Sequence, residues 1–206
     1  MGRAIDTLPS FFPSDRAAWR EWLQQNHLHS KGVWLIYYKK AAKKYSLSYY
    51  EIVEEALCFG WIDSLPRKRD EETAQLLITP RKPKSVWSQL NKQRIEQLIA
   101  AGLMTEAGRL SISTARANGS WFALDASDQA ADTNTLPPEL KKALAANKKA
   151  DRHFKAFSVS VRRQFLSWIL SAKTETTKQK RINTTVEMSA LNVKPGPKGF
   201  KIESNL

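Results

Sequence analysis

The chain has 206 residues, of which 42% are hydrophobic, and its formal net charge is +13. This length can bury a core without disulfides, and the single cysteine, Cys58, excludes an intrachain disulfide. Residues 1–13 lack the continuous apolar run of a secretory signal, and no stretch is apolar enough to span a bilayer. We therefore expect a cytoplasmic protein, in which Cys58 is a buried structural thiol.

The first third of the chain predicts two helices and a strand. Apolar residues at helical spacing predict a helix over 15–27, and the apolar run 33–38 predicts a central strand covered on both faces. Ser48 and Glu51 have the spacing of a capping box, which predicts a helix that runs to Phe59 and ends at Gly60.

Two more strands and two more helices are predicted next. Residues 62–68 and 73–79 predict strands joined by an acidic hairpin tip, and Ser85 and Thr105 are expected to cap the helices. Over residues 1–122 this order predicts an α+β fold, with a small, mostly antiparallel sheet and helices packed on one side.

The chain changes character beyond this region. Residues 123–136 lack periodicity and predict a mobile linker, and 137–194 predict a basic segment of three helices. Between 141 and 181 twelve lysines and arginines face only two acidic residues. Residues 195–206 follow a Pro- and Gly-rich stretch and predict a flexible tail.

The sequence lacks the motifs of common catalytic and metal sites. It contains no phosphate-binding glycine loop, no nucleophile elbow and no pair of metal-ligand motifs. His27 and His29 lie two residues apart, where they project in different directions, and His153 is remote in sequence, whereas zinc requires three or four ligands. We expect no catalytic residue, no metal and no cofactor.

Residues 79–88 form the strongest candidate for a binding site. Cations, hydroxyls and the free N–H groups of a helix predicted to start at Ser85 would together attract a phosphate or a carboxylate. The alternative is that the two prolines only shape a connection and that the cations are solvated. The candidate ligand-binding residues in this segment are Arg81, Lys82, Lys84, Ser85 and Trp87.

Trp61 and Asp63 complete this candidate site. Trp61 would supply an apolar wall, and Asp63 would orient a ligand group or act as a base. The alternative is that Asp63 accepts backbone hydrogen bonds in a turn or pairs with an arginine of a neighbouring strand, as aspartates near turns often do.

Several short segments resemble the signature blocks of a known family. Segments 60–63, 79–88, 91–92, 102–105 with Gly108, 118–121, 165–169 and 172–176 with 181–182 are similar to those of the YdeI/OmpD-associated, or bacteriocin-protection, family. The resemblance spans about residues 15–190. It implies an association with resistance to bacteriocins or cationic antimicrobial peptides and, for some members, with an outer-membrane porin, but it implies no reaction. The lack of a signal sequence disfavours a porin partner, and the positive charge disfavours sequestration of a cationic peptide.

These observations predict a non-enzymatic stress-protection protein without a membrane span that binds a small anion, such as a phosphate-containing ligand, or a protein partner. One alternative is a nucleic-acid-binding protein in which residues 141–181 contact phosphates. A second alternative is an enzyme that uses Asp63 as a general base, although neither a nucleophile nor a metal accompanies that residue.

Overall fold

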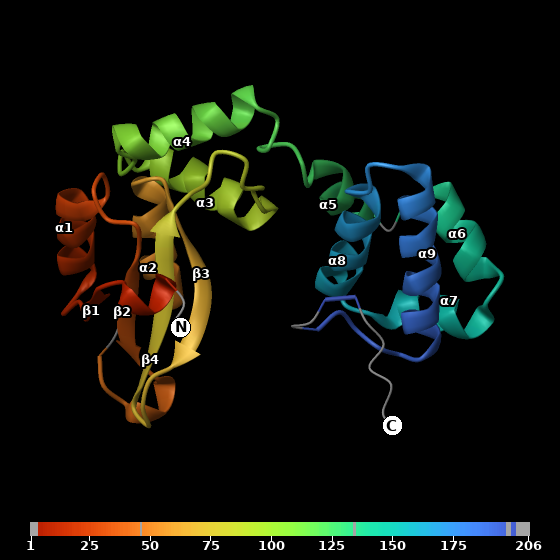
Figure 1. Cartoon of the computed structure of the whole chain (residues 1–206), viewed down its shortest axis with the longest axis horizontal. Coiled ribbons are helices and arrows are strands. Elements are labelled where there is room, and N and C mark those ends of the chain that lie inside the picture. Colours follow the sequence, from red (N-terminus) through yellow and green to blue (C-terminus); the bar gives the residue numbers. More distant parts are fainter. Residues whose placement is uncertain (1–3, 46, 134, 197–198, 201–206) are drawn as a thin grey trace. The chain divides into compact units, whose positions relative to one another are not determined.

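The structure is a computed structural model that describes residues 4–45, 47–133, 135–196 and 199–200. The chain divides into two compact units, Met1–Phe122 and Ala123–Leu206 (Figure 1). The first unit combines helices with a sheet and the second is helical, which confirms the predicted α+β class with a helical C-terminal part. Among the described residues, no helix is both long and apolar enough to cross a membrane.

The first unit contains a four-stranded sheet in the order β1-β2-β4-β3. Strand β1 pairs parallel to β2, and the other pairs are antiparallel, so the sheet is mixed. The elements are η1 (Ala4–Thr7), β1 (Ser10–Phe11), α1 (Arg16–Asn26), β2 (Val33–Tyr38), η2 (Lys40–Ala42), α2 (Tyr49–Cys58), β3 (Trp61–Lys68), β4 (Thr73–Pro80), α3 (Gln89–Ala100) and α4 (Glu106–Ala117). Strand β1 was not predicted because two residues show no periodicity.

Strand β2 lies inside the sheet and is covered on both faces, as predicted. Val33 and Leu35 belong to the main core, where they join residues of α1 and α2. Trp34 and Ile36 are also buried, and the indole of Trp34 donates a hydrogen bond of 2.7 Å to the carbonyl of Ile5. The N-terminal turn therefore covers the sheet face opposite the main core, because alternate residues of a strand point to opposite faces.

Helix α2 begins at the predicted capping box. The Ser48 hydroxyl accepts from the amide of Glu51, and the Glu51 carboxylate accepts from the amide of Ser48 at 2.8 Å. Helix α2 ends before Gly60, whose φ of 74° lies in the left-handed region that favours glycine. The sequence therefore determines both ends of this helix locally.

Helix α4 packs closely on the C-terminal end of α2. Thr105 caps α4 as predicted and also donates from its hydroxyl to the carbonyl of Cys58 at 2.6 Å. Gly108 then lies so close to the same carbonyl that a Cβ atom at this position would be 2.3 Å from the oxygen of Cys58. Only glycine permits this approach of one helix to the end of another.

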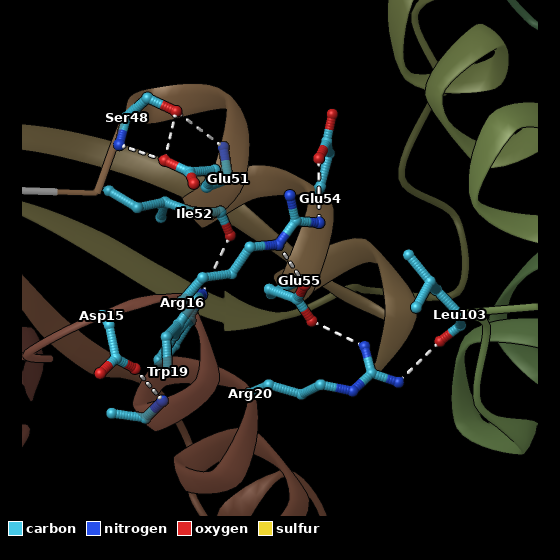
Figure 2. A network of polar contacts seen from close by, with 11 residues as sticks. Asp15, Arg16, Trp19, Arg20, Ser48, Glu51, Ile52, Glu54, Glu55 and Leu103 are labelled. Carbon is cyan, nitrogen blue, oxygen red and sulfur yellow. Dashed lines mark hydrogen bonds and ion pairs between the residues drawn. The ribbon is translucent and has the colours of Figure 1, made fainter. Parts of the chain in front are cut away.

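A buried carboxylate connects α1 to α2 (Figure 2). Glu55 is 2% exposed, and it accepts hydrogen bonds from Arg16 at 2.6 Å and from Arg20 at 2.7 Å. Arg20 also donates to the carbonyl of Leu103 at 2.8 Å, so the network extends to the segment before α4. Glu54 pairs with Arg16 at 3.0 Å and is more exposed than Glu55.

Helix α3 starts later than predicted. Its N-cap is Ser88, whose hydroxyl accepts from the amide of Asn91, and not Ser85. The preceding residues form an irregular connection because tertiary contacts hold it: Asn118 and Ser120 donate to the carbonyl of Pro83 at 2.8 and 3.2 Å. The prediction that Ser85 caps a helix is therefore wrong.

The described residues of the second unit form five helices where three were predicted. They are α5 (Asp125–Asp132), α6 (Pro138–Ala145), α7 (Lys148–Ala156), α8 (Val159–Leu170) and α9 (Glu175–Ala190). Asn147 starts α7 by accepting from the amide of Ala150, and this cap divides the single Lys- and Ala-rich helix that was predicted. Leu140, Phe154 and Phe165 are fully buried in the separate core of this unit.

Residues 123–136, predicted as a linker, contain helix α5, which corrects the prediction that they lack regular structure. Asp128 and Asp132 form ion pairs with Arg163 of α8 at 2.9 and 2.6 Å, and Asp128 is buried. These pairs stabilise a helix that has little apolar periodicity of its own.

Part of the predicted flexible tail packs on the second unit. The ring of Phe200 stacks on Trp168 with a centroid distance of 4.0 Å and an interplanar angle of 1°. Residues 197–198 and 201–206 of that tail lie outside the described residues.

Candidate functional site

A cavity of about 200 Å³ lies in the first unit between the connection that follows β4 and helix α4. It is lined by Arg81, Lys82, Pro83, Trp87, Ala107, Leu110, Ser111 and Thr114. Two cations contribute to a wall that is otherwise mostly apolar. Such a surface suits a small ligand that carries one anionic group.

Arg81 is the most unusual residue of this cavity. The carbon of its guanidinium lies 3.6 Å from the ring centroid of Trp87, which is itself buried. Both terminal nitrogens donate to the carbonyl of Val86, at 3.1 and 3.3 Å. The remaining Nε is buried and has no hydrogen-bond partner among the described residues.

Burial makes the charge of Arg81 unfavourable. It lowers the pKa of the guanidinium to about 10, and the carboxylate of Asp63 only partly opposes this shift. No carboxylate forms an ion pair with Arg81 within the described part of the chain. An anion in the cavity would restore the stabilisation that the arginine loses on leaving water.

The structure brings three of the predicted ligand-binding residues to this cavity. Arg81, Lys82 and Trp87 all line it, because the connection folds back on itself through the hydrogen bonds to Val86. Lys84 is exposed, and neither Lys84 nor Ser85 lines the cavity.

Trp61 and Asp63 lie elsewhere in the first unit. Trp61 is buried in the core, where its indole donates to the carbonyl of His27 at 3.3 Å. Asp63 lies in β3 beside a β-bulge and accepts a hydrogen bond of 2.8 Å from the hydroxyl of Tyr49. Asp63 therefore acts on Arg81 through its charge. The hydrogen bond that Asp63 accepts comes from the side chain of Tyr49, whereas a backbone donor in a turn was the alternative predicted from the sequence.

Helix α4 supplies the cavity wall that sequence reasoning missed. Leu110 is 64% exposed, although it is a large apolar side chain. Ser111 already donates to the carbonyl of Gly108 at 2.8 Å, whereas Thr114 makes no side-chain hydrogen bond in the described structure. The hydroxyl of Thr114 is thus a donor that a ligand can use. No signal in the sequence marked this wall, because an apolar residue within a helix predicts burial.

The fold and the cavity together define a class: a two-unit protein whose α+β unit carries a small cationic cavity. Within the described residues, no group of three or more histidine, cysteine or acidic side chains is arranged to hold a metal.

Comparison with known families identifies each unit separately. Residues 133–192 match the family described as "Bacteriocin-protection, YdeI or OmpD-Associated", which confirms the predicted resemblance, and residues 11–111 match a "Domain of unknown function (DUF8412)". The cavity lies almost wholly in the second of these matches, and the signature blocks predicted before residue 112 fall there too. No curated protein and no solved structure matches the chain. The family match supports a bacteriocin-protection type of function in general terms.

Proposed function

We propose that the first unit is a non-enzymatic binding module for a small organic anion, held in the cavity between Arg81 and α4. The observation that carries the proposal is the buried Arg81, which has no ion-paired carboxylate and faces a cavity. In a bacteriocin-protection type of protein, such a module would sense or sequester an acidic metabolite. We place this activity in the cytoplasm.

The cavity composition narrows the class of ligand. Its anionic group would lie beside the guanidinium of Arg81 and accept from the hydroxyl of Thr114, with Lys82 adding charge at the rim. Trp87 and Leu110 would contact an apolar part of the ligand. A cavity of about 200 Å³ accommodates a short-chain carboxylate or a small phosphate ester and excludes a large cofactor. A general-base role for Asp63 has no such support, because Asp63 does not line the cavity.

Arg81→Ala is expected to melt at a lower temperature than the wild type and to show no further shift when ligand is added, because it removes the stacking on Trp87 and the central cation. A thermal-shift screen of short carboxylates and phosphate esters measures the effect, and a ligand present at about 100 times its dissociation constant should stabilise the wild-type protein by about 2.7 kcal/mol. Lys84→Ala is the matched control, since it removes an exposed cation of the same connection that does not line the cavity. Equal responses in both variants would contradict the proposal, as would a wild-type protein that no anion stabilises.

A second candidate function concerns helix α7, and it rests on its exposed cations. Lys148, Lys149 and Arg152 are exposed and form no ion pair with described residues, whereas Lys155 pairs with Asp151 at 2.6 Å. Lys148, Arg152 and Lys155 are spaced i, i+4 and i+7, so they share one face of the helix. This stripe supports contact with nucleic-acid phosphates.

Replacing Lys148 and Arg152 together by alanine is expected to weaken binding of a labelled DNA duplex by a similar factor for every sequence. The dependence of log affinity on log salt should become less steep by about two, because two phosphate contacts are lost. Electrophoretic mobility shifts at several salt concentrations provide the measurement. Lys31→Ala, which removes an exposed cation of the first unit, is the control. A wild-type protein without salt-dependent binding would exclude this function.

A further inference from the structure

Arg94 of helix α3 is a buried cation that forms no ion pair with a described residue. Its side chain belongs to a residue only 6% exposed. Nη1 donates to the side-chain oxygen of Asn91 at 2.9 Å, but Nη2 is buried and has no hydrogen-bond partner among the described residues. A buried charge is costly unless it is paired and hydrogen-bonded, so this arginine has one strong donor left to offer.

The nearest chain groups do not neutralise Arg94. The hydroxyl of Tyr49 donates to Asp63 at 2.8 Å, and the centroid of the Tyr49 ring lies 6.0 Å from the guanidinium carbon of Arg94. Burial and the charge of Asp63 raise the pKa of Tyr49 to about 12, so this hydroxyl stays protonated and remains a donor to the carboxylate. Asp63 also acts through its charge on Arg81, so this carboxylate is not reserved for Arg94.

Two exposed aromatic rings lie beside the guanidinium. The ring centroid of Tyr50 is 5.3 Å from the guanidinium carbon of Arg94, and the rings of Tyr49 and Tyr50 meet edge to face at 6.2 Å. Tyr49 is 49% exposed and Tyr50 is 61% exposed. Both tyrosines belong to the first turn of α2, and exposed side chains of this kind change rotamer on a timescale of picoseconds to nanoseconds. Binding at Nη2 would require such a change to open a path to this buried nitrogen.

We propose that Arg94, Asn91, Tyr49 and Tyr50 form a second binding site, specific for an oxyanion carried on an aromatic ring. A carboxylate or phosphate oxygen of the ligand accepts from Nη2 of Arg94, and the ring of the ligand packs on Tyr50. Charge-assisted hydrogen bonds of arginine to an oxyanion are among the strong ones, and aromatic pairs add to the burial of apolar surface. None of these four residues lines the cavity beside Arg81, so this site is independent of the function proposed above.

Isothermal titration calorimetry of the full chain with phenyl phosphate and with benzoate tests the proposal. Both probes should bind, and phenol and inorganic phosphate should bind more weakly. Variants at Asn91 and Tyr50, which do not line the cavity beside Arg81, assign the binding to this site. Comparison of the two aromatic probes distinguishes a phosphate ligand from a carboxylate ligand. A wild-type protein that binds neither aromatic probe at about 10 mM would overturn the proposal.

Asn91→Asp is the decisive variant. The new carboxylate would pair with Arg94 within the chain, and an acidic residue in the first turn of α3 is favourable, so the variant should fold with a raised melting temperature. Its affinity for phenyl phosphate should fall by about tenfold or more, since the cation is already neutralised. Tyr50→Ala should also weaken binding, because it removes the stacking surface. Unchanged affinity in Asn91→Asp would show that Arg94 has only a structural role.

Discussion

Glu55→Ala is expected to lower the free energy of unfolding of the first unit by about 3 kcal/mol. The change removes the shared partner of Arg16 and Arg20 and leaves both cations at a largely buried helix interface (Figure 2). Breaking a buried ion pair costs about 3–5 kcal/mol, and the lower end applies because the arginine side chains are 35% and 32% exposed. Urea unfolding followed by tryptophan fluorescence measures the effect, since six of the seven tryptophans precede residue 123.

Glu54→Ala provides the matched control. Glu54 is the neighbour of Glu55 on the same helix and also pairs with Arg16, but its side chain is 25% exposed against 3% for Glu55. An ion pair with access to solvent contributes about 0–1 kcal/mol, so this variant should unfold close to the wild type. If the two variants lose equal stability, the buried network does not hold α1 on α2.

Gly108→Ala is expected to destabilise the first unit by about 3 kcal/mol, the upper end of the usual cost of overpacking. Its added methyl group would lie 2.3 Å from the carbonyl oxygen of Cys58 and 2.6 Å from the terminal carbon of Met104. Met104 can move, but the Cys58 carbonyl cannot, because it also accepts the hydrogen bond from Thr105. The same fluorescence-detected unfolding measures the loss.

The sign of the change in stability of Gly108→Ala tests the close packing of α4 on α2. In a helix without the close contact, replacing glycine by alanine stabilises by about 0.5–1 kcal/mol, so a stabilised Gly108→Ala variant would contradict the packing of α4 on α2. Gly102→Ala is the control. Gly102 has a φ of 69° and open space around it, so alanine there should cost only the conformational strain of about 1–2 kcal/mol.

The sequence was most informative where local chemistry determines the structure. Ser48, Thr105 and Gly60 mark helix ends through hydrogen bonds or dihedral angles within a few residues, and each was predicted. The start of α3 was missed because Ser85 and Ser88 are equally good caps locally. Contacts from Asn118 and Ser120, more than 30 residues away, hold the connection out of the helix.

Of the two walls of the candidate site, the sequence predicted only the one formed by the connection after β4. The cations and the tryptophan of the connection stand out in the sequence, but the opposite wall comes from α4 and depends on tertiary packing. Arg94 was missed for a related reason. Helix α3 places Leu90 and Ile99 toward solvent, at 53% and 40% exposure, and buries Arg94 with Ile95. Since Ile95 and Leu98 are buried, the spacing of apolar residues marks only part of the buried face of this helix.

Arg81 fixes the shape of its connection and also presents its charge to the cavity. Lysine could supply the charge but not the planar group that stacks on Trp87 and donates twice to Val86. In a saturation-mutagenesis library, selection for a stable fold alone should already deplete most substitutions at position 81. Variants at Lys82, which is exposed, should survive selection for a stable fold. Their abundances should differ from one another only under a second selection for ligand binding at a low ligand concentration.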